Sequence, residues 1–446
     1  MGFFSLLCLF PGLAFGQLEG IYTLSARAEA VERSPYEGMD TLTANHAVDV
    51  ELLPLAETEL WGGAWHFSGI YAPMLRLREV NAGPHQYEYT DAAGNSVTRI
   101  TPGRRFEHYH RLAWLAEHRK EGAARPYVRQ TFSYGQMDLL AAFTGAPALP
   151  GVPLNPRPIP SQSANTFALT DVQLETEAGI EIPLSRYWMV LAFIGYGWGG
   201  GLGAESRAYL PMARTPFFGL QTEWQMTAND TLILRLAGRY GFFLSNRAEA
   251  GTVDVYETWR HSFDEQTTVE LSAGASAYGG RPAPGQIPAS EDPSETQTIL
   301  GPQQPFQWSA APYVALRFLR HFAWETHSLD MDALGQIAPF LDRYTASAYE
   351  RAEASVGLRW RWEDVYAEGR GGMGKGLGLI AEQMAMTTYF MEAAIGYRFN
   401  PYLRTELRGN YASLPQFMPT ETEPVLVRTN QWRIGLSLTI EYSGSY

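Results

Sequence analysis

Hydrophobic and polar residues alternate strictly in the last long segment of the chain. In residues 432–442, WRIGLSLTIEY, apolar or aromatic side chains occupy the even positions, and small, hydroxyl or charged side chains occupy the odd positions. A period of two residues places the two sets on opposite faces of a β-strand, whereas a helix would spread both around its circumference. Residues 351–362, RAEASVGLRWRW, repeat the pattern. Both segments are therefore predicted strands with one apolar and one polar face.

The same alternation predicts about eighteen strands along the chain. Three of these segments alternate poorly (45–54, 323–336 and 364–377), so sixteen strands remain an alternative. The predicted strands lie near 20–30, 45–54, 64–78, 106–118, 125–138, 168–181, 187–199, 212–226, 230–244, 250–263, 266–279, 307–320, 323–336, 348–362, 364–377, 384–398, 402–414 and 430–442.

The connections between these strands differ in length. Every second connection is a tight turn, and those between are often long and rich in glycine, proline and acidic residues. Short turns are predicted at 183–186, 227–230, 264–266 and 400–401, and long loops at 79–105, 139–167, 280–306 and 415–429. This alternation is typical of a transmembrane β-barrel, with its turns in the periplasm and its loops outside the cell. An even number of strands leaves both termini on the periplasmic side and lets the last strand pair with the first.

Segment 231–244, TLILRLAGRYGFFL, shows how the pattern assigns each side chain to a face. Leucines alternate with Arg235 and Arg239, so a strand directs the leucines to lipid and both arginines to the lumen. Ile233 and Phe243 share the arginine parity and make the inner face partly apolar. A wetted inner face explains why these arginines need no acidic partner nearby in the sequence.

Segment 187–203, YWMVLAFIGYGWGGGLG, is apolar on both parities and could be a transmembrane helix. Its length is just below the ~20 residues that a helix needs to span a bilayer, and its glycines disfavour a helix. A strand whose inward face packs against a loop or plug is the favoured interpretation.

The composition fits a sheet with one apolar face and one face exposed to water. The chain has 446 residues, of which 45% are hydrophobic and only 18% are charged, and it contains 43 glycines. A soluble β-sandwich or propeller is the alternative, but neither explains the alternating connection lengths. The formal net charge of -13 argues against nucleic acid as a partner.

The first sixteen residues, MGFFSLLCLFPGLAFG, are an apolar run that ends in a small-x-small pattern before Gln17. They are predicted to be a signal peptide, although they contain no Lys or Arg, and the alternative is a short buried strand or helix. The only cysteine, Cys8, lies inside this segment. The predicted organisation is a signal peptide at 1–16 and a single transmembrane β-barrel domain at 17–446.

Taken together, the signal-like N-terminus, the amphipathic strands and the aromatic Tyr442 and Tyr446 near the C-terminus resemble Gram-negative outer-membrane β-barrels. Among these, the chain resembles the porin-like barrels associated with exopolysaccharide secretion. The resemblance implies an outer-membrane location in contact with lipid and lipopolysaccharide. It also implies recognition of the C-terminal strand by the barrel-assembly machinery, and partners in periplasmic polysaccharide export.

The predicted size of the barrel bears on its function. Eighteen strands spaced ~4.8 Å apart and tilted by ~40° give a backbone diameter of roughly 36 Å. Barrels of this size generally enclose water, so the chain is predicted to form a pore.

The polar faces of the predicted strands, which would line the lumen, carry arginines and acids in nearly equal numbers. On the first strands these include Arg27, Glu29, Asp49, Glu51, Arg76 and Arg78. This balance does not favour a dedicated anion pore. An acidic stripe on 168–181, which extends to Glu181, lies opposite arginines of the last strands. The stripe and the arginines either form a polar constriction or pair with neighbouring strands, and pairing is favoured. The candidate lumen-lining residues are Asp171, Glu175, Glu177, Arg235, Arg239, Arg351, Arg359, Arg361, Arg370, Glu392, Arg404, Glu406, Arg408 and Arg433.

Many aromatic residues lie near predicted strand ends. Because amphipathic rings favour the headgroup zone of a bilayer, they are expected to form two girdles around the barrel. Some of them could instead line the pore and stack on sugars. The candidate girdle residues are Trp224, Trp259, Trp308, Trp360, Trp362, Tyr397, Trp432 and Tyr442.

Motifs that carry chemistry are weak in this sequence. GRGGMGKG at 369–376 satisfies G-x4-G-K, but Gly376 replaces the Ser or Thr that would contact Mg²⁺. His108 and His110 share a strand face, but the sequence places no third metal ligand. The sequence therefore predicts no cofactor, no metal and no enzymatic activity. The favoured function is a pore for polar solutes or a secreted polymer such as exopolysaccharide. A barrel enzyme acting on lipid or peptide and a structural or adhesive barrel are the alternatives.

Overall fold

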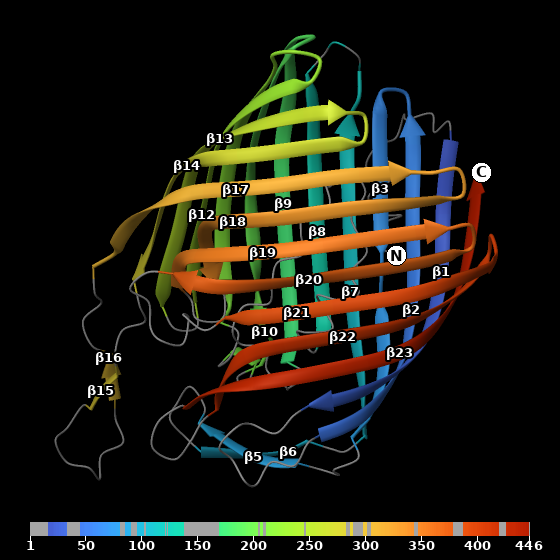
Figure 1. The fold of residues 1–446 in the computed structure, drawn as a ribbon. Coiled ribbons are helices and arrows are strands. Elements are labelled where there is room, and N and C mark those ends of the chain that lie inside the picture. The colour runs from blue at the N-terminus through green and yellow to red at the C-terminus, as the bar shows by residue number, and fades with distance from the viewer. Residues whose placement is uncertain are drawn as a thin grey trace.

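The computed structural model is a closed antiparallel β-barrel of eighteen transmembrane strands (Figure 1). The structure describes residues 17–33, 45–80, 85–90, 96–101, 104–120, 122, 124–137, 169–203, 206–207, 211–244, 247–281, 286–288, 298–300, 305–342, 347–377, 387–418 and 425–445. The predicted signal peptide and Tyr446 lie outside these residues, as do most of the predicted loops 139–167 and 280–306.

The barrel strands follow one another around the wall in chain order. They are Gln17–Arg33 (β1), Asn45–Gly62 (β2), Trp65–Tyr71 and Met74–Val80 (β3 and β4), Arg104–His118 (β7), Arg125–Met137 (β8), Leu169–Ser185 (β9), Trp188–Gly201 (β10), Ala213–Gln225 (β11), Asp230–Phe243 (β12), Ala248–Asp264 (β13), Thr267–Arg281 (β14), Gln307–Ala323 (β17), His327–Asp342 (β18), Ser347–Trp362 (β19), Val365–Leu377 (β20), Thr388–Asn400 (β21), Leu403–Met418 (β22) and Val425–Ser445 (β23).

β3 and β4 are two halves of one transmembrane strand, because both pair with β2 on one side and with β7 on the other. Two small hairpins lie outside the wall: His85–Thr90 pairs with Ser96–Thr101 (β5 and β6), and Gln286–Pro288 pairs with Thr298–Leu300 (β15 and β16). All eighteen predicted strands are present, including the three that alternate poorly. The prediction of eighteen strands is confirmed, and the alternative of sixteen is wrong.

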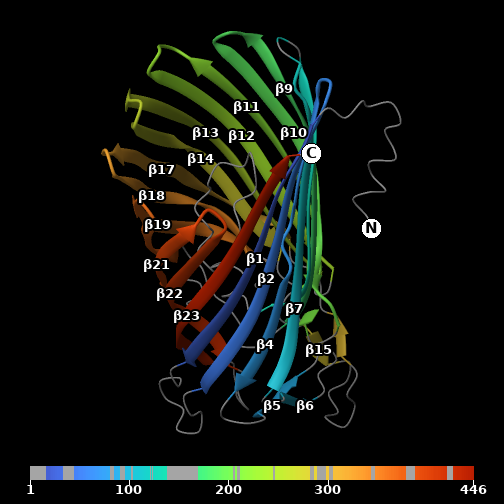
Figure 2. The same cartoon turned by 90° about the vertical axis from the view of Figure 1, so that its right-hand side faces the viewer.

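The first and last strands close the barrel. β1 pairs with β23 from Glu19↔Ser445 to Arg33↔Gln431, and β23 pairs with β22 on its other side. Figure 2 shows β23, β1 and β2 running side by side. Every barrel strand pairs with a neighbour on both sides, so closure removes the free edges of the sheet except where β17 and β18 separate near one end.

Apolar side chains cover the outside of the barrel. On β23, residues 431–440 alternate between buried and exposed, and the exposed set includes Ile434, Leu436 and Leu438. The arrangement is the reverse of that in a soluble protein, where large apolar side chains leave water. An exposed apolar band of this extent is stable only against lipid.

Short turns join the strands at one end of the barrel, as predicted. They include 63–64, 186–187, 265–266 and 401–402. The turn predicted at 183–186 lies further along the chain, because β9 continues to Ser185. At the opposite end, three connections (244–247, 343–346 and 419–424) are also short, so the alternation of lengths is incomplete. The prediction of a long loop at 415–429 is wrong, because β22 continues to Met418 and β23 begins at Val425. We call the two ends the short-turn end and the long-connection end.

Segment 187–203 contains the whole of β10 and does not form a helix. Its inward face contains glycines over which neighbouring side chains pack: a Cβ atom on Gly195 would lie 2.1 Å from the Phe217 ring, and one on Gly219 of β11 would lie equally close to Phe193. The inward apolar residues are therefore accommodated by the wall itself. Within the described part of the chain, no helix is long and apolar enough to cross a membrane.

The wall is split between β17 and β18 near the long-connection end. Pairing of these strands runs from Ala323↔Ser328 only as far as Val314↔Ile337. Among the described residues, 307–313 of β17 and 338–342 of β18 therefore do not pair with each other, while β18 stays paired with β19 up to Asp342↔Ser347. The end of the β18–β19 hairpin thus separates from the strand that precedes it.

This hairpin end packs against the inner face of β11, β12 and β13. Leu341 and Ala348 contact a buried apolar cluster made of Ala213, Phe243, Ala248 and Ala250. On β12 the neighbouring Phe242 is exposed to the outside, so Phe243 and its cluster face inward. The wall is therefore two layers thick here, which we call the overlap, and it explains the inward Phe243 in a strand that also carries arginines.

Candidate functional site

The pairing register places the fourteen candidate lumen residues on the face opposite to the exposed apolar side chains. For example, Arg433 and Glu406 lie between outward residues such as Ile434 and Leu407. The inner wall divides into two parts with different access to solvent. One part is a dry sector around the closure of the barrel, and the other is a wet sector on the remaining strands.

The dry sector contains a network of buried charges that we call the closing network. It consists of Arg27 and Glu29 from β1, Asp49 and Glu51 from β2, Arg76 and Arg78 from β4, Glu107 from β7 and Arg433 from β23. The side chains of Arg76, Asp49 and Glu107 are 0% exposed. Their positions follow from the register, which places Asp49 opposite Arg78 and Glu51 opposite Arg76.

Each acid of the network contacts at least one arginine. Asp49 and Arg78 form a two-pronged pair in which Nε and Nη2 donate to the two carboxylate oxygens at 2.8 and 2.7 Å. Arg76 lies 2.6 Å from Glu51 and 3.3 Å from Glu107, and it bridges β2 and β7. Four positive and four negative groups balance, which is the condition for burying charge at tolerable cost.

A backbone position of β23 also depends on the network. Gly435 lies opposite Glu29 in the register, and a Cβ atom there would lie 2.5 Å from Glu29 Cγ. Only glycine leaves room for the Glu29 side chain, which lies 3.5 Å from Arg433. The network thus joins the first and last strands as well as β2, β4 and β7.

Three acids of the network, Glu29, Asp49 and Glu51, have oxygens within 4.8 Å of one another, close enough for a cation. The arginines already neutralise this group, since Arg27 lies 3.2 Å from Glu29 and 3.6 Å from Glu51. The donor set is therefore better explained as the acidic half of the closing network than as a metal site.

The wet sector contains charged pairs whose arginines remain open to solvent, although Glu177 is itself buried. Arg129 lies 2.6 Å from Glu177 and is 43% exposed, and Arg359 lies 3.5 Å from Glu368 and is 47% exposed. Arg260 lies 2.7 Å from Glu270 on the next strand. Positive and negative side chains therefore lie next to each other around the wall. The wet sector offers many weak polar contacts and no strong electrostatic field of one sign.

One pair in the wet sector extends across two intervening strands. Arg239 of β12 lies 3.3 Å from Glu175 of β9. Its guanidinium lies 4.9 Å from the centre of the Phe217 ring. The glycines of β10 have no side chains, so they leave space on the inner face of the wall for this contact. The acidic stripe of β9 is thus contacted by arginines from both sides.

The arginines of the last strands also have acidic partners. Arg408 contacts Glu406 at 2.9 Å and Glu368 at 3.0 Å, and Arg351 contacts Glu353 at 3.0 Å. Of these contacts, only Arg408–Glu368 joins two strands, while Arg408–Glu406 and Arg351–Glu353 each lie within one strand. Arg361, Arg370, Glu392 and Arg404 lie on the same inward parity.

Two similar tyrosine sites lie near the short-turn end, on β8 and β20. Tyr127 donates to Glu177 at 2.8 Å, and Tyr366 donates to Glu406 at 2.8 Å. Each ring covers a glycine on the adjacent strand, Gly179 or Gly396, so it lies flat on the wall. Each glutamate also contacts an arginine. The sequence analysis missed these sites, although tyrosine on the polar parity was the available signal.

A pair of tyrosines lies farther from the short-turn end, also in the wet sector. The rings of Tyr256 and Tyr313 are parallel, with centres 4.0 Å apart, and they meet above Gly274 of the intervening strand. The inner wall therefore displays flat aromatic surfaces between ion pairs.

The eight candidate girdle residues lie on the outward parity in two groups. Trp308 and Trp432 lie toward the long-connection end, and the other six lie near the short-turn end. Trp432 and Tyr442 are ten positions apart on β23. With the rise of a tilted strand, this separation spans roughly 25 Å across the bilayer, which matches the apolar band of outer-membrane barrels.

The other motifs take no part in a site. Gly369–Gly376 lies within β20, so no helix N-terminus is available to hold a phosphate. His108 and His110 lie on the outward parity of β7, where His110 contacts the Tyr71 hydroxyl at 2.9 Å.

Comparison with solved structures finds proteins that align with most of this chain at low identity. Pseudomonas aeruginosa OccK2 (OpdF) in complex with glucuronate has 11% identity and a TM-score of 0.37, over 95% of this chain and 96% of that one. Acinetobacter baumannii OccAB3 has 11% identity and a TM-score of 0.38, over 95% and 99%. P. aeruginosa OpdK with vanillate has 11% identity and a TM-score of 0.39, over 95% and 99%.

The search of curated proteins finds no match. A family model, by contrast, matches residues 19–378, which include most of the barrel from β1 to β20. The matched segment carries the dry sector except for Arg433, both tyrosine sites except for Glu406 and Arg408, and the overlap. The chain belongs to the EpsX exopolysaccharide export family.

Proposed function

We propose that this outer-membrane barrel is the pore through which an exopolysaccharide chain leaves the cell. The observation that carries the proposal is the wet sector, where ion pairs with solvent-exposed arginines lie beside flat tyrosine rings. The family match supports the same conclusion. Passage of small polar solutes is the coarser function that the same pore allows.

The chemistry of the wet sector suits a sugar polymer. A sugar ring has hydroxyl groups at its edge and C–H groups on its faces, so it can exchange hydrogen bonds with ion pairs and rest on an aromatic ring. Transport requires contacts that are numerous but individually weak, so that the chain enters and also leaves. Exposed ion pairs contribute little energy each, which meets this condition.

The proposal includes an orientation and partners. The short turns and both termini face the periplasm, so the Tyr127 and Tyr366 sites lie at the entrance, where periplasmic components of polysaccharide export would deliver the chain. Residues 1–16 act as the signal peptide, and the C-terminal strand is recognised by the barrel-assembly machinery. The girdle residues hold the barrel among lipid and lipopolysaccharide. The barrel acts as a channel and not as an enzyme.

The proposed function is tested with the purified barrel in a planar bilayer. Steady conductance of the order of a nanosiemens is expected. A linear neutral glucan oligosaccharide should interrupt the current for longer than a polyethylene glycol of matched size, because only the sugar can exchange hydrogen bonds with the wall. A barrel without conductance contradicts a pore of any kind. Equal block by the two polymers contradicts a polysaccharide channel while leaving a solute pore.

The exposed arginines should set the ion selectivity of the pore. Replacing Arg129 and Arg359 together with Gln removes two solvent-exposed cations and leaves Glu177 and Glu368 in the wet sector. We expect the permeability ratio of cation to anion to rise a few-fold, as measured from the reversal potential in a KCl gradient. The matched control is Arg119→Gln, which removes an exposed arginine at the short-turn end beyond β7. An unchanged ratio in the double variant contradicts passage through the wet sector.

The tyrosine sites should act on sugars specifically. Replacing Tyr127 and Tyr366 with Ala removes both flat rings, so we expect the block by the glucan oligosaccharide to shorten several-fold while the block by polyethylene glycol stays the same. Replacement with Phe keeps the rings but removes the hydrogen bonds to the glutamates, and we expect an intermediate effect. If both polymers respond equally to the Ala variant, the rings only affect the width of the pore.

A further inference from the structure

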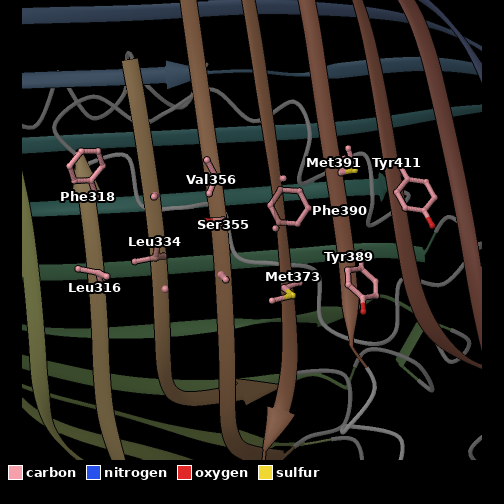
Figure 3. Close-up of a pocket in the computed structure, with 15 residues that line it drawn as sticks. Leu316, Phe318, Leu334, Ser355, Val356, Met373, Tyr389, Phe390, Met391 and Tyr411 are labelled. Atoms are coloured by element: carbon pink, nitrogen blue, oxygen red, sulfur yellow. The ribbon is translucent and has the colours of Figure 1, made fainter. Parts of the chain in front are cut away.

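The outer face of the barrel contains an apolar groove on β17 to β22. It has a volume of about 600 Å³ (Figure 3). The floor is made of small residues on three neighbouring strands, including Ala333 and Gly335 on β18, Ala354 on β19 and Gly371 on β20. The register pairs Gly335 with Ala354, and Ala354 with Met373. Ala333 and Gly371 both pair with Val356, so the small residues form a depression around the Val356 side chain.

Large side chains form the rim of this groove. They come from both sides of the floor: Leu316 and Phe318 from β17, Met373 from β20, Tyr389 and Met391 from β21, and Tyr411 from β22. Figure 3 shows these side chains spread across neighbouring strands, with other strands of the barrel crossing behind them. The lining contains no charged residue among the described positions.

The groove faces the membrane interior. Its residues continue the parity of Ile434 and Leu436, the exposed apolar side chains of β23, through the pairings of Trp432 with Tyr411 and of Tyr411 with Met391. The Tyr411 and Trp432 rings are 4.3 Å apart, so one edge of the groove adjoins the aromatic residues toward the long-connection end. The groove thus lies in the half of the apolar band nearest to that end.

We propose that this groove binds one acyl chain of a membrane lipid from the leaflet at the long-connection end. In hydrocarbon, association depends on close packing, and small residues permit that packing. A second barrel would present a convex wall of large side chains, which does not fit a concave floor of Gly and Ala. The flexible Met373 and Met391 side chains can adapt to a chain of variable shape. The proposal concerns the outer face and is independent of what passes through the lumen.

The groove also adjoins the split in the wall. Leu316 pairs with Gly335 two positions from Val314↔Ile337, where β17 and β18 stop pairing. An acyl chain in the groove would contact β17 and β18 together immediately beside this point. The lipid would therefore fill the outer surface where the backbone ladder ends.

Two glycines allow the groove to be filled without disturbing the wall. A Cβ atom on Gly335 would have no atom within 4 Å, and one on Gly371 would lie 3.7 Å from Met391 Cγ, an ordinary contact. Gly335→Leu together with Gly371→Leu should therefore occupy the groove. The matched control is Gly369→Leu. Gly369 lies on the same face of β20, two positions from Gly371, and its nearest potential contact is at 3.9 Å, but it does not line the groove.

The probe is a phosphatidylcholine with a diazirine in one acyl chain, mixed into phosphatidylethanolamine nanodiscs that hold the full chain. After irradiation, peptides are analysed by mass spectrometry, and heat-modifiable migration on a gel shows that each variant is folded. We expect adducts at Met373, Tyr389 and Met391 to exceed those at the equally outward Ile434 and Leu436 by roughly fivefold. The double Leu variant should abolish this excess, and Gly369→Leu should retain it.

Three results would overturn the proposal. Equal labelling of the groove and of β23 shows ordinary surrounding lipid only. An excess that persists in the double Leu variant places the lipid elsewhere. A covalent link between two barrels through groove residues identifies a second copy of the chain as the occupant.

Discussion

Replacing Asp49 with Ala is expected to destabilise the barrel by about 3–5 kcal/mol, because removal of one acid from the buried network leaves its four arginines with only three acids. Asp49 is 0% exposed and provides both oxygens of the two-pronged contact with Arg78. Without it, Arg78 loses that contact in a site that water does not reach. The measurement is the urea dependence of folding into liposomes, followed by heat-modifiable migration.

The matched control for this variant is Glu175→Ala. Glu175 pairs with Arg239 on the same inner face, but both side chains are more than one third exposed. Solvent screens such a pair, so its loss should cost less than about 1 kcal/mol. If the two variants lose similar stability, the closing network is not dry and its arginines have access to water.

A paired substitution separates the burial of charge from simple loss of packing. Replacing both Asp49 and Arg78 with Leu removes the two charges together. Buried ion pairs are often no better than apolar residues of similar size, so the double variant should recover much of the stability lost in Asp49→Ala. Recovery would show that the main cost of the single variant is an unpaired charge.

The closing network shows that the alternation of polar and apolar residues does not predict which inward side chains water reaches. Seven of its eight members lie on positions that the sequence analysis assigned to the polar face of a strand, and only Glu107 was missed. Alternation identifies the face of a side chain but does not show whether water reaches that face. From the polar faces of the strands, the sequence analysis therefore predicted a single wetted lumen. The structure instead shows a dry sector around the closure of the barrel and a wet sector on the other strands.

The fold was predictable because the alternation extends over residues 432–442 of β23 and 351–362 of β19, and because many other segments predict the same kind of strand. The overlap was not predictable. Ile233 and Phe243 indicated that the inner face of β12 is partly apolar, but the residues that cover Phe243 come from β18 and β19, about a hundred positions away. The groove likewise depends on small residues that become neighbours only through the register.

The second large effect is expected at the overlap. Replacing Phe243 with Ala removes the largest side chain of the buried cluster, which is 1% exposed, and should cost about 3–5 kcal/mol through lost contacts and the cavity left behind. Its neighbour Phe242 points outward and is 43% exposed. Phe242→Ala is therefore the matched control, and because lipid can fill the space that the ring leaves, we expect a loss of less than about 1 kcal/mol.

Chemical labelling distinguishes a loosened overlap from general instability. Ala348 contacts the cluster, and the only cysteine of the chain is Cys8, so Ala348→Cys introduces one thiol into the barrel domain. This thiol should react slowly with a membrane-impermeant maleimide when Phe243 is present, and at least several-fold faster when Phe243→Ala is added, under conditions where both barrels remain folded. Since no β17–β18 backbone pairing holds the end of the hairpin, side-chain packing must retain it against the wall. Fast labelling with Phe243 in place would contradict the overlap, and slow labelling in both barrels would show that other contacts hold the hairpin.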